Sequence, residues 1–254
     1  MAFPLLPLLA LLTLAHAAAA PPPAPAPARK TVAVLNFDNN SGSAEYDPLG
    51  KGLAAMMISD LAGVEAIQLV ERERLQELTA EMERQQTKYF DPATATQVGR
   101  FAGAEYVVAG AVFALEPRIR IDTRVIRVQT GEIVKAAEVL GRKDQLFELQ
   151  QKLADRLIDD LAVALSPEER ERLRQQQERN RIAEFEVLLA YSQALALFDG
   201  GDYVGAAARM RPVVAGAPQS ALVRASYELM KRRAAEAGKN RLRDGLNRLL
   251  DRRP

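Results

Sequence analysis

The sequence contains no cysteine and no tryptophan, and its only histidine is His16. Without cysteine there is no disulfide, thiol nucleophile, zinc–thiolate site or lipid-modified cysteine. His16 lies in the apolar N-terminal stretch, and removal of that stretch would leave a protein without histidine. Ser–His and Cys–His dyads and histidine-ligated metals would then be excluded as well. Carboxylate, lysine and Ser–Lys chemistry stays open, although no motif points to it.

An excess of charge of one sign is also missing. The chain of 254 residues carries 34 Lys/Arg against 33 Asp/Glu, a formal net charge of +1. The global charge therefore does not direct the protein to nucleic acid or to a membrane. After residue 20, no segment approaches the roughly 20 consecutive apolar residues of a membrane-spanning helix. Apolar residues make up 48% of the chain, enough for the core of one large or two modest domains.

Residues 1–20, MAFPLLPLLALLTLAHAAAA, are typical of a secretory signal peptide. An apolar run at 5–14 is followed by small residues that fit a cleavage site. No Lys or Arg precedes that run, so an uncleaved N-terminal anchor is the alternative. Pro4 and Pro7 and the short apolar run argue against a spanning helix. We predict an exported, periplasmic protein that is not a lipoprotein, because no cysteine follows the signal.

Residues 21–30 are a Pro/Ala-rich linker. The part at 21–28, PPPAPAPA, is typical of a stiff polyproline spacer. A disordered leader is the interpretation we favour over a recognition motif.

Residues 31–165 show the alternation of strand and helix patterns expected of a mixed-sheet α/β sandwich. Val32, Val34 and Phe37 are candidate core residues of the first strand. The predicted strands are 31–37, 66–70, 104–115 (broken by Gly110), 118–128 and 133–141, and the predicted helices are 49–62, 72–86, a short one from Asp91-Pro92, and 144–165.

Strict alternation in RIRIDTRVIRV (118–128) places Ile119, Ile121, Thr123 and Val125 on one face of a strand. That period is typical of a half-exposed antiparallel strand. The turn at Gln129-Thr130-Gly131-Glu132 then predicts a hairpin with the strand at 133–141.

Residues 166–183 predict a polar connecting helix. Ser166 has the place of the N-cap, Pro167 that of the first helical position, and Glu169 completes a capping box. We place the domain boundary near Ser166, because the helix that follows is almost wholly polar.

Residues 184–254 predict an all-helical, tetratricopeptide-like module with a basic tail. Ala194, Ala206, Met210 and Pro218 occupy positions that such a hairpin requires, although Ala190 replaces its aromatic residue. One unit is clear at 184–218, and a degenerate second could lie in 220–237. A lone unit cannot bury its apolar face. It must therefore pack on the first domain, on a second copy or on a partner.

The tail at 231–254 holds nine Lys/Arg against three Asp/Glu, a net charge of +6. Its leucines form an apolar stripe at positions 242, 246, 249 and 250. The stripe indicates either a capping helix that covers the repeat unit or an amphipathic helix that docks on an anionic surface of the outer membrane or cell wall.

The loop FDNNSGSAEYDPLGKG (37–52) is where a ligand site would be sought. Asp38, Glu45 and Asp47 could hold a hard cation, but their spacing is not that of an EF-hand. Gly50-Lys51-Gly52 precedes a helix, but it lacks the hydroxyl and glycine spacing of a P-loop. We expect a scaffold or protein-contact loop, and we predict no catalytic, cofactor-binding or metal-ligating residue and no cofactor.

Four stretches resemble the curli production assembly/transport family of the CsgG type: TVAVLNFDNNSG, LVERERLQELTAEME, VGRFAGAEYVVAGAV and RVIRVQTGEIV. The resemblance covers about residues 31–165. Similar openings occur in the amino-terminal domain of TolB and in outer-membrane activators of peptidoglycan synthases. The resemblance implies a non-enzymatic envelope component with a periplasmic α/β domain.

Two departures from the secretion channel of this family limit the resemblance. The chain has no lipidation cysteine. Only Leu115-Glu116-Pro117 separates two neighbouring strands, which leaves no room for membrane hairpins with strands of about 9–11 residues. We therefore do not predict a pore.

Three functions remain open. The first is an exported scaffold that binds other envelope or secretion proteins through sheet edges and the helical hairpin, with homo-oligomerisation open and no nucleic-acid partner. The second is a ring-forming component of an outer-membrane secretion system or an activator of a peptidoglycan synthase. The third is an enzyme that uses paired acids from Asp38, Glu45 or Asp47.

Overall fold

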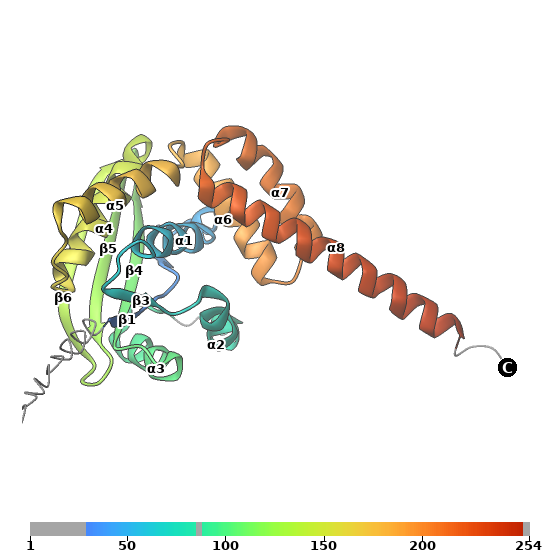
Figure 1. Ribbon diagram of the computed structural model, residues 1–254, viewed down its shortest axis with the longest axis horizontal. Coiled ribbons are helices and arrows are strands. Elements are labelled where there is room, and N and C mark those ends of the chain that lie inside the picture. Colours follow the sequence, from blue (N-terminus) through green and yellow to red (C-terminus); the bar gives the residue numbers. More distant parts are fainter. Residues whose placement is uncertain (1–28, 85–87, 251–254) are drawn as a thin grey trace, which may run out of the picture.

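The computed structural model describes residues 29–84 and 88–250 (Figure 1). The predicted signal peptide and almost all of the linker lie outside these residues. The strands are β1 (Lys30–Val34), β2 (Asp38–Asn39), β3 (Ile67–Leu69), β4 (Tyr106–Leu115), β5 (Arg118–Arg127) and β6 (Glu132–Arg142). The α-helices are α1 (Leu49–Leu61), α2 (Arg72–Arg84), α3 (Pro92–Ala102), α4 (Leu146–Asp160), α5 (Pro167–Arg179), α6 (Phe185–Asp199), α7 (Tyr203–Gly216) and α8 (Ala221–Leu250).

The strands form one mixed sheet in the order β3-β1-β4-β5-β6, with β2 paired to β4. β1 runs parallel to β3 and β4. β4, β5 and β6 form an antiparallel meander. The α/β class and the mixed sheet predicted from the sequence are therefore confirmed.

Successive residues of β1 supply both sides of the sheet, as the period of two requires. Val32 and Val34 belong to the core under α1 and α4. Ala33 and Leu35 belong to a second core, to which α3 and α2 contribute Val98 and Leu75. The predicted face of β5 is buried on the α1 and α4 side, because residues 119, 121, 123 and 125 are all buried.

Three local predictions need correction. β4 runs without a break through Gly110, which pairs with Thr123 of β5, and the ring of Phe37 occupies the space where a Cβ at Gly110 would stand. The helix predicted to end near residue 165 stops at Asp160, and Ala162 follows with a φ of +50°. The short strand β2 was not predicted from the sequence.

Two predicted helix starts are confirmed by their caps. The Asp91 carboxylate accepts a hydrogen bond from the backbone N–H of Thr94, and Pro92 begins α3. Ser166 and Glu169 form the reciprocal capping box of α5.

The helical module packs on the α/β sandwich through α6, which lies against α1, and α8 covers α7 (Figure 1). The lone repeat unit thus buries its apolar face on the first domain and under α8. The degenerate second hairpin proposed for 220–237 is wrong, because α8 is one continuous helix of 30 residues.

The two halves of α8 differ in environment. Val223 and Met230 in the first half are buried, whereas Leu242 is 77% exposed. In its described part, the leucine stripe therefore does not cover the repeat unit. Within residues 29–84 and 88–250, no helix combines the length and hydropathy needed to cross a membrane.

Candidate functional site

The loop after β1 is organised by its own hydrogen bonds. The buried Asp38 carboxylate accepts hydrogen bonds from the backbone N–H groups of Tyr89 (3.1 Å) and Phe90 (2.9 Å). Burial raises the pKa of Asp38, and these two bonds oppose the rise. Asp38 therefore ties the loop to the segment that precedes α3.

The acids of this loop have separate structural partners. The Asn39 amide donates to the Asp47 carboxylate (2.6 Å) and to the carbonyl of Ser43 (2.7 Å). Glu45 is exposed. Among the described residues, no group of three or more His, Cys, Asp or Glu side chains could hold a metal ion. The hydrogen bonds of Asp38, Asn39 and Asp47 thus hold the loop in place.

Gly50-Lys51-Gly52 lies within the first turn of α1 and not before a helix, and its two glycines provide space for close packing. A Cβ at Gly50 would overlap the backbone of Phe37, and a Cβ at Gly52 would overlap the Oγ of Ser192 on α6. Lys51 lies between them and forms an ion pair with Asp199 at 3.0 Å. Gly50-Lys51-Gly52 therefore joins α1 to its neighbours.

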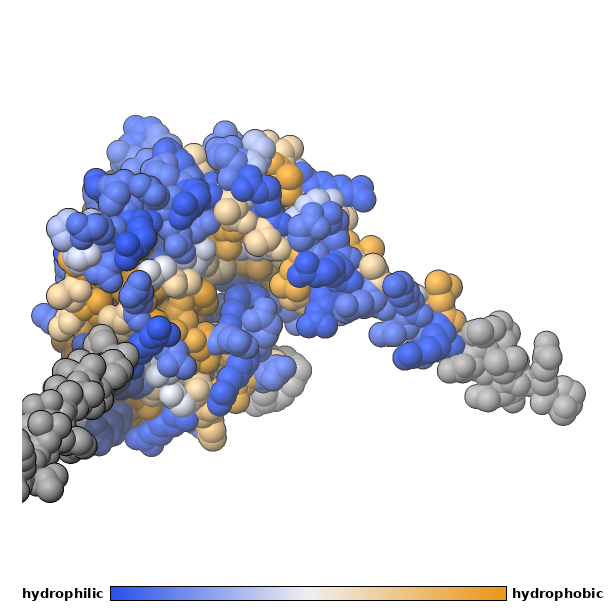
Figure 2. All heavy atoms as spheres, viewed as in Figure 1, coloured by the Kyte–Doolittle hydropathy of each residue, from blue (hydrophilic) through white to orange (hydrophobic). Residues whose placement is uncertain are grey.

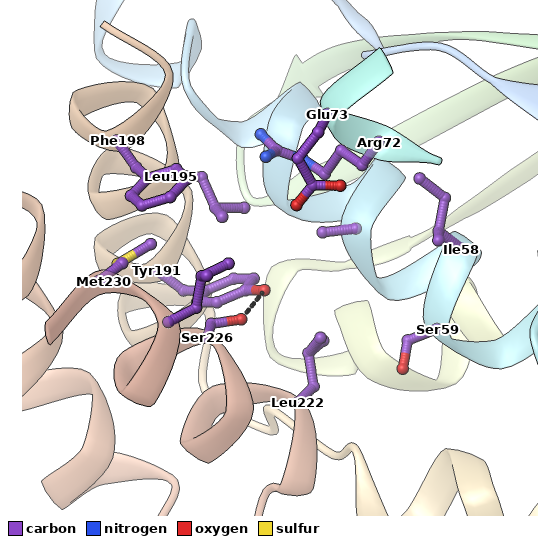
Figure 3. A pocket seen from close by; sticks show the side chains of 12 residues that line it. Ile58, Ser59, Arg72, Glu73, Tyr191, Leu195, Phe198, Leu222, Ser226 and Met230 are labelled. Atoms are coloured by element: carbon purple, nitrogen blue, oxygen red, sulfur yellow. Dashed lines mark hydrogen bonds between the residues drawn. The ribbon is translucent and has the colours of Figure 1, made fainter. Parts of the chain in front are cut away.

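A groove lies between α1, the start of α2, α6 and α8, and we call it the junction groove (Figure 3). It consists of two adjoining cavities of about 260 and 240 Å³. They share Arg72, Glu73, Phe198 and Leu229. The inner cavity is mostly apolar and is lined further by Ala55, Ile58, Ser59, Tyr191, Leu195, Leu222, Ser226 and Met230.

An ionic cluster stands at the α2 end of the junction groove. Asp199, the last residue of α6, pairs with Arg72 at 2.7 Å and with Lys51 at 3.0 Å. The Asp199 side chain is 4% exposed, and those of Arg72 and Lys51 are 17% and 15% exposed. The Nε of Arg72 is buried and has no hydrogen-bond partner. The cluster joins three elements, and the Arg72 Nε is a buried donor within it.

The groove has the chemistry of a binding surface. The hydroxyls of Tyr191 and Ser226 lie 3.0 Å apart, and Figure 3 shows them at the apolar wall. Burial raises the pKa of Tyr191, so its phenol stays neutral near pH 7 and cannot serve as the base for Ser226. The arrangement can hold an apolar group beside a cation and hydroxyls.

A second contact joins the loop to the helical module. Lys143 bonds to Glu116 and to the Tyr46 hydroxyl, and its ammonium lies 4.7 Å from the ring centre of Tyr46 and 5.1 Å from that of Phe185. Tyr46 and Phe185 also meet edge to face at 5.8 Å. The loop after β1 therefore buttresses the start of α6.

Sequence reasoning missed the junction groove. Its residues come from four separate helices, and none of those segments is unusual by itself. The local signal is Asp199, which stands beside the double glycine at the end of α6. An aspartate in that position is typical of a turn, so it does not by itself indicate an ion pair.

Replacing Gly52 by alanine is expected to weaken the junction. The added methyl group overlaps the Ser192 hydroxyl, so we expect unfolding free energy to fall by about 1–3 kcal/mol. Urea denaturation measures the loss. The double variant Gly52→Ala/Ser192→Gly removes the overlap and should recover part of it. Equal stability of Gly52→Ala and wild type would contradict the packing described for α1 and α6.

Residues 13–121 match the family model described as "Curli production assembly/transport component CsgG". The match ends inside β5. It confirms the resemblance inferred from the strand and helix motifs of this segment.

A curated protein of Rhizobium meliloti (strain 1021), named "Putative adenylate cyclase 3", is 26% identical over 205 residues. The alignment covers 80% of this chain and 33% of that protein. The chain thus spans about a third of the length of this relative.

Three solved structures are similar to part of this chain. The LpoB C-terminal domain from Salmonella enterica is 20% identical, with 46% of this chain and 86% of that chain covered and a TM-score of 0.33. TolB from Acinetobacter baumannii is 14% identical, with 52% and 28% covered and a TM-score of 0.37. A PelC dodecamer from Paraburkholderia phytofirmans is 16% identical, with 54% and 90% covered and a TM-score of 0.34.

Proposed function

We propose that this chain is an exported, non-enzymatic accessory protein of cell-envelope assembly or curli-like secretion that acts through protein–protein contacts. The match of residues 13–121 to the CsgG family supports the envelope role. The N-terminal signal-like stretch supports export to the periplasm. The observation that carries the contact role is the open edge of the sheet at β6.

β6 is a long edge strand. It has 11 residues and pairs with β5 along one side, and in the described part of the chain no strand pairs with its other side. The opposite edge of the sheet, β3, has only three residues. The Glu138 carbonyl of β6 accepts a hydrogen bond from the Arg156 side chain. An edge of this length that pairs with no strand presents further backbone N–H and C=O groups to which an extended segment can add.

The side chains of β6 suit a protein partner. Ile133 is 40% exposed and Leu140 is 48% exposed. Both pair with residues of β5 on the sheet face opposite α4, whereas Val139 is buried toward α4. Glu132 and Arg142 stand at the two ends of the strand. The edge thus combines unpaired backbone groups, exposed apolar side chains and charges that can fix the register of an added strand.

A photo-crosslinking amino acid at position 133 or 140 is expected to capture a discrete protein product in cells. The matched controls are positions 101 and 204, where Phe101 and Val204 are 63% and 53% exposed on other elements. The double variant Ile133→Lys/Leu140→Lys is tested with the crosslinking probe at position 138. It should abolish the crosslinked product and impair the envelope function, and the protein should stay folded. Equal capture at all four positions would contradict a role for β6.

The mass of the chain in solution, measured by light scattering, separates the two forms of the proposal. A large closed oligomer would favour a ring-forming secretion component. A monomer or dimer would favour an adaptor or an activator of a peptidoglycan synthase. If the purified chain converts ATP to a cyclic nucleotide, the proposal that the protein is non-enzymatic is wrong.

A further inference from the structure

The second half of α8 stands away from the body of the protein. At 1.5 Å per residue, its 30 residues span about 45 Å. Figure 1 shows that only the first half lies against α7, and residues 238–244 are all exposed. We call residues 231–244 the α8 arm. They are the part of this projection for which side-chain exposure is described. A flat surface could reach its whole length.

One face of the α8 arm is apolar. Ala235, Gly238 and Leu242 follow one another at spacings of three and four residues, which places them on one side of the helix. Figure 2 shows the arm as mostly hydrophilic, with apolar atoms gathered near its outer end. The sequence continues the same spacing with leucines at positions 246 and 249.

The charges of the arm are arranged around this face. The arm contains six Lys/Arg and two Asp/Glu, a net charge of +4. At about 100° per residue, Arg241 and Arg243 flank Leu242 on its two sides, and Lys239 lies about 60° away. Glu236 and Asp244 lie about 120° and 160° from Leu242. Lys239, Arg241 and Arg243 therefore flank the apolar stripe, whereas Lys231 lies within about 20° of it at the inner end of the arm. The acids lie farther round the helix from the stripe.

The flanking cations are available for contact. In the residues that the structure describes, the ion pairs of the arm involve Lys231 with Glu228 at 2.7 Å and Arg233 with Glu236 at 3.5 Å. These two cations lie at the inner end of the arm. Lys239, Arg241 and Arg243 at its outer end are exposed.

We propose that the α8 arm docks on an anionic phospholipid surface, lying in the plane of the membrane. Leu242 enters the boundary between headgroups and acyl chains, and Lys239, Arg241 and Arg243 contact the phosphates. An apolar stripe with cations on both sides fits a lipid surface better than a nucleic acid, which offers phosphates without an apolar layer. This inference is independent of the proposed contact at β6.

The absence of cysteine allows a direct test with single probes on the full chain. We place an environment-sensitive fluorophore on Gly238→Cys, on the apolar face, or on Asn240→Cys, about 160° from it. A Cβ at position 238 meets no atom within 4 Å, so the substitution is tolerated. With phosphatidylglycerol vesicles we expect a blue shift and a several-fold intensity rise at 238 and little change at 240.

Charge variants complete the test. Arg241→Glu/Arg243→Glu is expected to weaken vesicle binding at least tenfold. Arg179→Glu/Arg211→Glu makes the same charge change at exposed positions of α5 and α7 and should leave binding within twofold. The N-terminal apolar stretch is common to all variants and does not alter the comparison.

Several results would overturn the proposal. They are no response at position 238, equal responses at 238 and 240, equal binding to neutral phosphatidylcholine vesicles, or equal loss in the control variant. The same spectral change at 238 with heparin, a polyanion without an apolar phase, would show that charge alone is recognised.

Discussion

At pH 8, Asp60→Asn is expected to raise the free energy of unfolding by about 2–4 kcal/mol. Asp60 lies on α1 and is 2% exposed. Its carboxylate accepts a hydrogen bond from the Gln150 amide on α4 at 2.6 Å. An asparagine oxygen can accept the same bond without burying a charge.

The pH dependence follows from the pKa of this group. Burial raises the pKa of Asp60 to about 7, the Gln150 bond opposes the rise, and the nearby Asp155 carboxylate adds to it. Between about pH 4 and 7 the unfolded chain has lost this proton and the folded chain keeps it. The stabilisation held by the protonated form is therefore complete below about pH 4 and is lost as pH rises through 7.

Urea denaturation from pH 4 to pH 8 measures this effect. The difference between Asp60→Asn and wild type should be near zero at pH 4, grow with pH and level off above pH 7. Asp159→Asn, with a side chain that is 66% exposed, serves as the control and should track wild type. A difference that does not depend on pH would refute the assignment to Asp60.

Asp199→Asn is expected to lower the free energy of unfolding by about 2–3 kcal/mol. The change leaves the cations of Arg72 and Lys51 without their carboxylate in a largely buried site. We place the loss below the 3–5 kcal/mol of a fully buried pair, because both cations retain some contact with solvent.

A second substitution tests the origin of that loss. Asp199→Asn/Lys51→Met removes one of the two uncompensated cations and should be more stable than Asp199→Asn alone. Protease resistance between α5 and α6 should change in the same order, because the cluster holds the helical module on the sandwich. Lys51→Met is compared in two backgrounds, wild type and Asp199→Asn. If it destabilises both proteins by the same amount, Lys51 and Asp199 do not interact.

Local pattern predicted the class and most of the elements of this fold. Alternation in β5 identified its buried face, and the caps at Asp91 and Ser166 located two helix starts, because these signals depend on neighbours within a few residues. The absence of cysteine excluded whole classes of chemistry without any knowledge of the fold.

The tertiary structure decided what the local pattern could not. Arg72 and Asp199 are 127 positions apart, and Asp60 and Gln150 are 90 apart, so neither pair has a sequence period that could reveal it. Gly110 pairs within β4 and makes room for the ring of Phe37, which comes from another segment, so its role is not visible in the local pattern. The sequence by itself determined most of the strands and helices and the absence of any thiol or disulfide chemistry. The order of the strands, the open edge at β6, the junction groove and the exposure of the α8 arm depend on contacts between distant segments, and only the folded chain makes those contacts.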